Sequence, residues 1–441
     1  MRVLVIGGGI GGLCLAQALR RSGVDVSVYE RDINRTLRLD RFRLHINPAG
    51  VRSLNACLPP EAWREFLATA GRPGGGFGFL SEKLENLVVV EDEIMYPQTS
   101  DPAERWYPVD RSSLRGLLLR GLDDVVHYDK TFERYDVHPD GRVTAFFADG
   151  SSATGDVLVG ADGANSRVRQ QYLPQAEKID TGARGVGLKL RLTEQTRAWL
   201  PPRLGVGENL VLSAAPFFLF TSVFERVPRA ARTHAVDAPA PADDGDYLLC
   251  AFVARRDACP AEMTDLDGAD LQRVLVTMTE RWHPDLRRLI AECDPNSVGC
   301  YPFLATALIA PWESTNVVLL GDAVHSMPPT GGLGANTALR DARLLARQLT
   351  AAARAEKLLR PAVAEYEAEM RDYGFAAVGS ALSTLRQGMI SNRFAVAGIH
   401  TWFRLSAALP ALKRLGFRDT WAKGARRLPW ENGDLDPTDA S

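Results

Sequence analysis

The chain has 441 residues, of which 46% are apolar and 24% are charged, and its net charge at pH 7 is −2. This length is enough for two connected domains with a large core, and the composition is that of an ordinary globular protein. The nearly balanced charge argues against a nucleic-acid partner.

Three further features limit the class of protein. No run of about 18 apolar residues exists, so no transmembrane segment is predicted. The first predicted strand follows Met1 almost at once, which leaves no room for a signal peptide, and we expect a cytoplasmic protein. The six cysteines are scattered without a C-x-x-C pair, so neither a disulfide framework nor a metal site is predicted.

A glycine-rich turn near the N-terminus follows an apolar strand predicted at 2–6. The glycines with the G-x-G-x-x-G spacing are Gly7, Gly9 and Gly12. A helix over 13–22 and a strand over 24–29 complete the context in which this spacing predicts a dinucleotide site. Gly7 permits the tight turn, Gly9 lets a pyrophosphate approach the backbone, and Gly12 lets helix and strand pack closely. The alternative is a glycine-rich turn that binds no ligand.

Glu30 ends the second predicted strand. An acid at this position is placed to bind ribose hydroxyls, and it disfavours a 2′-phosphate on that ribose. NADP is therefore not expected at this site.

Residues 71–101 interrupt this first unit. The triple glycine at 74–76 lacks the G-x-G-x-x-G spacing, so we interpret it as a loop that enters a strand near the substrate. The first unit resumes at about 106, and the apolar residues at 143–147 before Asp149-Gly150 predict a small β meander.

A second strand-to-turn motif covers 156–169. The apolar strand at 157–159 runs into Asp162 and Gly163, and Ser166 is placed to cap a helix that begins with basic residues. A bare Asp-Gly pair is usually only a turn, but the length of this motif and its leading strand favour a binding site.

Residues from about 175 to 299 are rich in predicted strands, at 185–192, 209–224 and 247–254. Alternation along the aromatic strand separates two faces, one with Phe218, Phe220, Ser222 and Phe224, the other with Phe217, Leu219, Thr221 and Val223. Either face can line a pocket or belong to the domain core. The segment 226–246 is rich in Ala, Pro and Asp and is expected to be a mobile loop.

The third and most informative motif lies at 316–349. The apolar run at 316–320 delivers Gly321 and Asp322 to the end of a strand, and a glycine-rich turn then opens a helix at about 334–349. Backbone N–H groups at such a helix start attract a negative or electron-rich ligand. His325 is expected to fix this turn by a hydrogen bond.

Beyond 349 the chain is expected to be mostly helical, over 352–369 and 371–387. From Arg393 to Arg427, eight Lys or Arg residues and one acid interleave with aromatic and leucine side chains. This segment is either a membrane-surface helix, a lid on the pocket, or a helix packed on the first domain with a solvated basic face. Residues 431–441 are expected to form a disordered acidic tail.

In this order the three motifs resemble those of the single-component flavoprotein monooxygenases, the aromatic hydroxylase and epoxidase family of the p-hydroxybenzoate hydroxylase type. The resemblance covers about residues 1–350 and implies an α/β fold. In that fold a Rossmann-like FAD-binding domain is interleaved with a mainly β substrate domain and followed by C-terminal helices. The implied boundaries are 1–70, 102–174 and 300–350 for the FAD-binding domain, 71–101 and 175–299 for the substrate domain, and 351–441 for the helical region with its tail.

By position, the resemblance implies that all three motifs contact FAD. The residues carried over are Gly7, Gly9, Gly12, Glu30, Arg31, Asp162, Gly163, Gly321, Asp322, Gly331, Gly332, Leu333, Gly334, Ala335 and Asn336. Pro328 is implied to lie on the substrate side of the flavin ring, and the turn that follows it near the pyrimidine edge.

Three arginines are further candidates. Arg111 begins a helix with the family's Arg-x-x-Leu pattern and is implied to approach the FAD ribose or phosphate, the alternative being a solvated charge. Arg41 and Arg43 lie in the segment that crosses the flavin in this family. The family usually has small residues where Arg43 stands, so either arginine is a candidate for the phosphate-facing one. Arg43 and His45 are also candidate catalytic residues that line the substrate pocket with Pro328, and surface charge is the remaining alternative.

The resemblance implies an FAD- and NAD(P)H-dependent monooxygenase. NADH or NADPH would reduce the flavin, and a flavin C4a-hydroperoxide would transfer one oxygen atom from O2 to an aromatic or polyene substrate by hydroxylation or epoxidation. The aromatic strand, with Phe218, Phe220 and Ser222 as candidate substrate residues, favours a bulky, mainly apolar substrate such as a natural-product intermediate. No side chain is recognisable as a base for a phenol.

Two other classes of function share part of this pattern. One is a flavin-dependent oxidoreductase without oxygen insertion, of the prenyl-chain reductase or halogenase type, but the Trp-x-Trp-x-Ile-Pro signature of a halogenase is absent. The other is a non-catalytic flavin-binding protein. In each case a monomer or a homodimer is expected.

Overall fold

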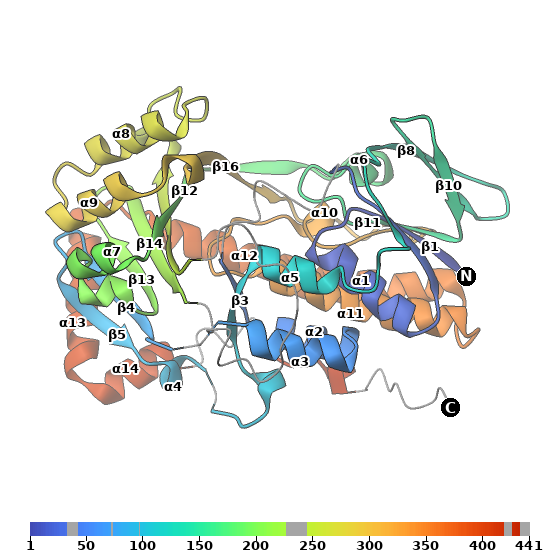
Figure 1. Cartoon of the computed structure of the whole chain (residues 1–441), viewed down its shortest axis with the longest axis horizontal. Coiled ribbons are helices and arrows are strands. Elements are labelled where there is room, and N and C mark those ends of the chain that lie inside the picture. The colour runs from blue at the N-terminus through green and yellow to red at the C-terminus, as the bar shows by residue number, and fades with distance from the viewer. Residues whose placement is uncertain (33–42, 72–73, 97, 226–244, 419–425, 433–441) are drawn as a thin grey trace.

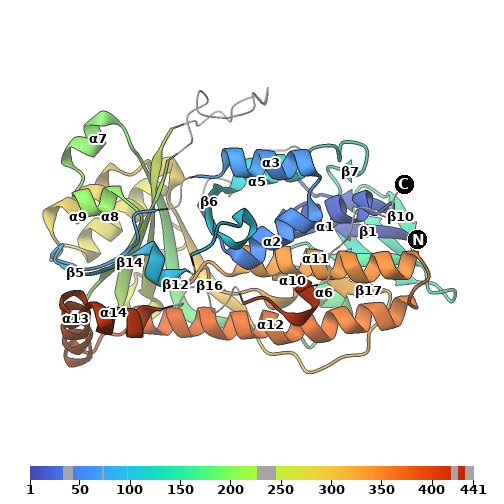
Figure 2. The same cartoon turned by 90° about the horizontal axis from the view of Figure 1, so that it is seen from below.

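The computed structural model describes residues 1–32, 43–71, 74–96, 98–225, 245–418 and 426–432. A parallel sheet with its helices forms one half of the molecule, and a larger, mainly antiparallel sheet forms the other half (Figure 1). One long helix, α12 (Leu359–Gly388), runs along both halves (Figure 2). The predicted fold class, a Rossmann-like domain interleaved with a mainly β domain and followed by helices, is confirmed.

The parallel sheet has the strand order β17-β11-β1-β2-β7. Its strands are β1 (Arg2–Ile6), β2 (Asp25–Tyr29), β7 (Val126–His127), β11 (Val157–Gly160) and β17 (Val317–Leu319). The central strands are short apolar runs that are almost wholly buried, as expected of parallel strands covered by helices. The strands that precede the three sequence motifs, β1, β11 and β17, are neighbours, so the turns that follow them meet at one edge of the sheet.

Helices with one apolar side surround this sheet. They are α1 (Ile10–Arg21), α2 (Pro48–Cys57), α3 (Pro60–Thr69), α5 (Arg111–Leu118), α6 (Arg167–Tyr172), α10 (Asp322–His325) and α11 (Gly334–Ala353). The buried sides of the helices and the sheet share one core, which includes Leu13, Leu54, Leu118 and Leu345.

Two smaller sheets belong to the same half. The predicted meander is confirmed and consists of β8 (Phe132–Val137), β9 (Val143–Phe147) and β10 (Ser152–Gly155). In addition, β3 (Arg43–Ile46) pairs with β6 (Tyr107–Asp110). This second pairing fixes the path of the chain where the resemblance implies that it crosses the flavin.

The larger sheet has the strand order β16-β12-β15-β14-β13-β4-β5. Its strands are β4 (Phe77–Ser81), β5 (Asn86–Val90), β12 (Lys178–Arg191), β13 (Glu208–Leu212), β14 (Phe217–Phe224), β15 (Tyr247–Arg255) and β16 (Gly299–Thr306). The triple glycine at 74–76 leads into β4, as predicted. β16 falls in the segment assigned to the FAD-binding domain from residue 300, yet it hydrogen-bonds to β12 of this sheet.

The two faces of β14 have different neighbours. Phe217 and Leu219 belong to the core that the sheet shares with α8 (Gly268–Met278) and α9 (Pro284–Glu292). On the opposite face, Phe218 packs with Leu385 of α12. The face that carries Phe218, Phe220 and Ser222 is therefore the one turned toward the parallel half. The short helices α4 (Asp92–Met95) and α7 (Glu194–Trp199) complete this part of the fold.

α12 is a single helix of 30 residues. The prediction of two helices, over 352–369 and 371–387, is wrong because neither a proline nor a capping residue separates them. A helix of this length extends about 45 Å. Tyr366 and Met370 in its first half belong to the core of the parallel sheet, and Leu385 near its end belongs to a cluster on the larger sheet, so α12 joins the two halves.

The basic segment after α12 forms α13 (Arg393–Ala408) and α14 (Pro410–Phe417). Phe403 and Phe417 pack on Phe79 of β4, at ring-centroid distances of 4.4 and 5.8 Å. The interpretation that this segment packs on the FAD-binding domain is therefore wrong, since it packs on the larger sheet. Within the described ranges, no helix combines the length and the apolarity needed to cross a membrane.

Residues 426–432 return to the parallel half of the molecule. The Glu431 side chain is fully buried, and its carboxylate accepts hydrogen bonds from Arg52 of α2 and Arg340 of α11, each at 3.1 Å. The prediction of an acidic tail from residue 431 is therefore wrong for Glu431, because partners remote in the chain bury it. Residues 433–441, and the predicted loop at 226–246 apart from Gly245 and Asp246, lie outside the described residues.

Replacing Glu431 by alanine is expected to destabilise the protein. The change leaves the guanidinium groups of Arg52 and Arg340 buried without this carboxylate, which typically lowers the free energy of unfolding by about 3–5 kcal/mol. Urea unfolding of Glu431→Ala, followed by circular dichroism, measures the loss. The matched control is Glu356→Ala, which removes an exposed carboxylate and is expected to change stability by no more than about 0.5 kcal/mol. Equal stability of the two variants would contradict this role of Glu431.

Candidate functional site

The first glycine turn is held by hydrogen bonds from two directions. The Gly8 N–H donates to Glu30 Oε2 at 2.7 Å, so the acid at the end of β2 is buried and tied to the turn. From α5, Arg115 Nε donates to the Gly8 carbonyl oxygen at 3.1 Å. Arg31, the next residue after Glu30, is exposed. Two chain segments outside the motif therefore fix the conformation of the turn.

One side of the first turn is closed and the other is open. A Cβ atom at Gly12 would lie 2.2 Å from the Gly7 carbonyl oxygen, and one at Gly7 (φ +111°) would lie 2.3 Å from the Ala161 carbonyl oxygen. The first turn is thus pressed against the second motif. By contrast, a Cβ atom at Gly9 or at Gly163 would meet nothing within 4 Å. The open side leaves space for a ligand beside the N-terminus of α1.

The second motif starts α6 with two side-chain caps. Asp162 Oδ2 accepts hydrogen bonds from the Arg167 N–H at 2.8 Å and the Val168 N–H at 3.3 Å. Ser166 Oγ accepts one from the Arg169 N–H at 2.8 Å, which confirms the predicted cap. Burial raises the pKa of Asp162. Its Oδ1 atom is buried with no hydrogen-bond partner among the described residues, so it is available to a donor on a ligand.

Arg169 joins the second motif to the third. Its Nη1 atom donates to the Ala164 carbonyl oxygen at 3.1 Å and to the Ala323 carbonyl oxygen at 3.0 Å. Arg169 is almost fully buried, and burial lowers its pKa. Because the side chain spans two turns, neither turn can move without breaking these hydrogen bonds.

Asp341 of α11 fixes the third motif. Its Oδ2 atom accepts hydrogen bonds from the Gly321 N–H at 2.8 Å and from His325 Nε2 at 2.7 Å, and its Oδ1 atom accepts one from the Tyr373 hydroxyl at 2.7 Å. The His325 and Asp341 side chains are fully buried. The hydrogen bond predicted for His325 is confirmed, and its acceptor is a carboxylate 16 residues further along the chain.

Asp322 lies at the carboxyl end of β17 beside the start of α11. Its side chain is exposed, yet its Oδ1 atom lies 3.7 Å from where a Cβ of Gly334 would be. Burial acts to raise the pKa of Asp322, and the charges of His325 and Arg111 act in the opposite direction, with a net rise. The carboxylate thus lies at the start of α11, within reach of the charge of Arg111 of α5.

Asn336 ties the glycine turn after Pro328 to the chain between β3 and α2. Its Nδ2 atom donates to the carbonyl oxygens of Gly332 and His45, each at 2.7 Å, and its Oδ1 atom accepts a hydrogen bond from the Asn47 N–H at 2.9 Å. Pro328 is buried. The first-turn N–H groups of α11, from Gly334 onward, have no acceptor within the helix and are available to a ligand.

Arg43 of β3 reaches across to the larger sheet. Its guanidinium is buried, and it contacts the Glu208 carboxylate of β13 and the Ser222 hydroxyl of β14. Burial acts to raise the pKa of Glu208, but Arg43 and His45 outweigh it and lower that pKa to about 2. Glu208 therefore stays ionised at neutral pH, and its charge is paired with that of Arg43 inside the protein.

His45 stands between the glycine turn and the larger sheet. Its Cβ atom lies 3.5 Å from the position that a Cβ at Gly332 would occupy. Its Nε2 atom is 2.9 Å from the Tyr96 hydroxyl, its Nδ1 atom is 3.6 Å from Glu208 Oε1, and its ring stacks on Trp106 at 4.8 Å. Burial raises the pKa of Tyr96 well above its usual value, so the Tyr96 hydroxyl keeps its proton.

The structure brings most of the predicted site residues together at the carboxyl ends of β1, β11 and β17. Arg41 lies outside the described residues, and the Arg43 guanidinium points to the larger sheet rather than to the first motif. Residues that sequence reasoning missed are Tyr96, Arg115, Arg169, Glu208 and Asp341. Arg115, Arg169 and Asp341 had a local signal, since each lies on the helix that a motif begins.

The residues at this edge of the sheet fit FAD. Gly9 and Gly163 leave open space for a pyrophosphate, and the N-terminus of α1 offers free N–H groups to it. Asp162 has a buried oxygen without a partner, and Asp322 presents a carboxylate to the ribityl region implied by the resemblance.

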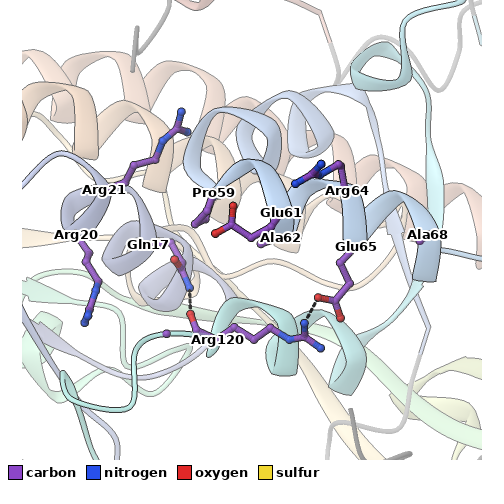
Figure 3. Close-up of a pocket in the computed structure, with 11 residues that line it drawn as sticks. Gln17, Arg20, Arg21, Pro59, Glu61, Ala62, Arg64, Glu65, Ala68 and Arg120 are labelled. Carbon is purple, nitrogen blue, oxygen red and sulfur yellow. Dashed lines mark hydrogen bonds and ion pairs between the residues drawn. The ribbon is translucent and has the colours of Figure 1, made fainter. Parts of the chain in front are cut away.

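A separate cavity of about 660 Å³ is not this site. It lies between α1, α3 and the end of α5, and its lining includes Gln17, Arg20, Arg64 and Arg120 (Figure 3). Gln17 and Arg20 are in the second half of α1, whereas Gly7 and Gly9 precede the first residue of that helix. The lining mixes arginines with Glu61 and Glu65, and Arg120 pairs with Glu65.

Comparisons with known proteins identify the family. A family profile described as an FAD binding domain matches residues 277–379, and one described as an NAD(P)-binding Rossmann-like domain matches residues 5–52. A solved structure from Photorhabdus luminescens, assigned as an FAD-containing monooxygenase, is 35% identical to this chain and has a TM-score of 0.78. The match covers 88% of this chain and 99% of that one. The chain belongs to the FAD-dependent monooxygenases.

Two curated relatives agree with this assignment. An FAD-dependent urate hydroxylase of Klebsiella pneumoniae is 29% identical over 384 residues, which are 84% of this chain and 86% of that protein. A dual O-methyltransferase/FAD-dependent monooxygenase of Cercospora beticola is 31% identical over 401 residues, or 84% of this chain. The match spans 44% of that longer relative, less than half its length. FAD is thus the cofactor of this monooxygenase, as predicted, and the Rossmann-like match supports a nicotinamide co-substrate.

Replacing Gly9 by valine is expected to abolish FAD retention without unfolding the monooxygenase. The side chain enters space that the protein leaves open, so it displaces the cofactor and not a neighbouring residue. Flavin absorbance after gel filtration and the far-ultraviolet circular dichroism spectrum measure the two effects. Gly12→Val is the matched contrast, since it collides with the Gly7 carbonyl oxygen and is expected to destabilise the fold itself. Full flavin content in Gly9→Val would contradict this placement of the pyrophosphate.

The His325–Asp341 pair is expected to make stability depend on pH. Burial acts to lower the pKa of His325, but the charges of Asp341 and Asp322 and the hydrogen bond to Asp341 outweigh it and raise that pKa. A histidine whose pKa is raised by folding stabilises the folded protein when it is protonated. This contribution is complete below the pKa of the unfolded chain, about 6.5, and it disappears as pH rises through the pKa of the folded protein. The thermal unfolding midpoint of the wild type should therefore exceed that of His325→Gln most at low pH, with the difference shrinking as pH rises. A difference independent of pH would show that protonated His325 contributes nothing.

Proposed function

We propose that this monooxygenase uses FAD and a nicotinamide nucleotide to insert one oxygen atom from O2 into a bulky, mainly apolar aromatic or alkene substrate. When bound, FAD would take two electrons from the nicotinamide nucleotide and react with O2, so that one oxygen atom goes to the substrate and the other leaves as water. The protein contributes the orientation of flavin and substrate and the exclusion of water from the site.

One observation carries the proposed substrate class. On the face of β14 that is turned toward the flavin half, Phe218 is buried with Leu385 and Ser222 is buried against Arg43, which leaves Phe220 as the candidate substrate residue that is partly exposed. His45 lies between the glycine turn and Glu208, the residue of β13 that pairs with Ser222. Phe220 is half-buried beside Phe77 at 6.3 Å between ring centroids, so part of an aromatic surface remains available. Such a surface suits a flat or extended apolar molecule.

The polar side of the proposed pocket is small. Arg43 and Glu208 neutralise each other and are buried, and among the described residues His45 and Tyr96 are two polar groups that lie between the glycine turn and the larger sheet. We expect them to orient a hydroxyl or carbonyl group of the substrate. Pro328, buried at the start of that turn, gives this side of the pocket a rigid apolar wall.

N–H groups of the protein are also placed to favour the reduced flavin. The first turn of α11 carries unpaired N–H groups and the positive end of the helix dipole, which stabilise negative charge on a bound ring. Asn336 holds this helix start against β3, so these donors keep their direction when the cofactor changes charge.

The proposal is tested by two linked measurements on the FAD-loaded protein. Anaerobic mixing with NADH or NADPH should bleach the oxidised flavin and identify the electron donor. Aerobic incubation with a panel of phenols and polyenes should then show one substrate that increases O2 consumption and yields a product heavier by one oxygen atom, labelled when labelled O2 is used. Gly9→Val serves as the flavin-free control. Flavin that neither nucleotide reduces, or O2 uptake that yields only hydrogen peroxide across the panel, would overturn the proposal.

A further inference from the structure

Exposed apolar side chains gather at one corner of the molecule. Eleven large hydrophobic side chains of the described residues are exposed; four of them lie on α13 and α14, and a fifth, Leu409, lies between these helices. We call this set the outer face; its members are Phe394, Trp402, Leu405, Leu409 and Leu415, with exposed fractions of 90%, 39%, 49%, 53% and 82%. Soluble proteins rarely expose such a cluster unless the surface has a partner.

The outer face follows from helical spacing. Phe394, Trp402, Leu405 and Leu409 are eight, three and four residues apart, so they share one side of the helix and its end. The opposite side carries Val396 and Phe403, which are buried on the larger sheet. α13 is therefore apolar on two opposite sides, although a surface helix needs only one apolar side to pack on its own protein.

The charge of these two helices indicates what covers the outer face. Between Arg393 and Arg418 the chain has five Lys or Arg residues and no Asp or Glu. Two of these cations pair with carboxylates of the sheet below, Arg404 with Glu85 at 2.8 Å and Lys413 with Glu91 at 2.6 Å. The segment itself stays basic within a protein of net charge −2.

Basic residues around an apolar strip with tryptophan, phenylalanine and leucine match an anionic lipid surface. The apolar side chains enter the boundary between headgroups and acyl chains, and the arginines meet the lipid phosphates and carboxylates. A second copy of the chain is a poorer match, because a twofold interface through this face would bring two basic segments together. We propose that the outer face docks this monooxygenase on the surface of an anionic lipid bilayer.

The outer face also has a defined shape. The Trp402 ring lies against Gly416 of α14, where a Cβ would be 2.9 Å from the ring. Phe403 and Phe417 anchor the two helices on Phe79 from below. The corner is thus ordered without a partner, and docking need not fold it.

Both views place the outer face at the end of the molecule formed by the larger sheet (Figures 1 and 2). If the substrate is the apolar molecule of the proposed function, docking brings the half of the protein that binds it next to a lipid bilayer, in which bulky apolar molecules dissolve.

Flotation of the full-length, FAD-loaded protein with lipid vesicles tests the proposal. The protein is expected to float with vesicles of phosphatidylcholine and phosphatidylserine, to stay behind with phosphatidylcholine alone, and to be released by high salt. Phe394→Ser/Leu415→Ser, which changes the two most exposed members, is expected to weaken vesicle binding about tenfold or more. The matched control, Leu308→Ser/Leu358→Ser, removes leucines that are 80% and 78% exposed elsewhere and is expected to bind like the wild type.

Three results would overturn the docking proposal. They are no flotation of the wild type with anionic vesicles, equal binding by the two double variants, and a wild-type dimer that Phe394→Ser/Leu415→Ser converts to a monomer in analytical ultracentrifugation. The last result would assign the outer face to a second copy of the chain. Flotation needs neither substrate nor turnover, so failure here is distinct from failure of the proposed oxygen insertion.

Discussion

The parallel pairing of β1, β11 and β17 is the constraint on which the rest of this structure depends. Ile6 is level with Gly160, and Gly160 is level with Leu319, so the three following turns begin at the same height. The close contact between Gly7 and the Ala161 carbonyl oxygen requires this register. Three motifs separated by more than a hundred residues can therefore act on one cofactor only because their strands are neighbours.

Behind these turns, a few buried polar side chains hold the site in shape before FAD binds. Arg169 and Asn336 each bond backbone groups of two separate segments, and Asp341 bonds the Gly321 N–H, the His325 ring and the Tyr373 hydroxyl. In a low-dielectric interior such hydrogen bonds are strong when complete and costly when broken. These hydrogen bonds are made within the protein, so we expect the cofactor to meet a preformed surface.

The sequence was sufficient for the parts of this fold that depend on local patterns. The glycine turns, their strands, the Ser166 cap, the meander and the two faces of β14 all follow from spacing and periodicity. The continuous α12, the sheet on which α13 packs, and the burial of Glu431 do not, because each depends on a surface formed by remote segments. The same limit applies to the site. No local pattern marks Glu208 or Tyr96 in the sequence, and their contact with His45 arises only because β3 places that residue beside them.

Arg43 stands at a position where the resemblance implies a small residue. A buried ion pair seldom stabilises a protein by itself, since the loss of hydration offsets the attraction between the charges. The contact of Arg43 with Glu208 is therefore better understood as a positional restraint, which fixes β3 against β13 and so places His45 between the glycine turn and the sheet. Side chains of this size occupy space that small residues would leave open. Arg43 thus joins the two halves of the molecule beside the glycine turn, because its contacts with Glu208 and Ser222 hold the strand that carries His45 against the larger sheet.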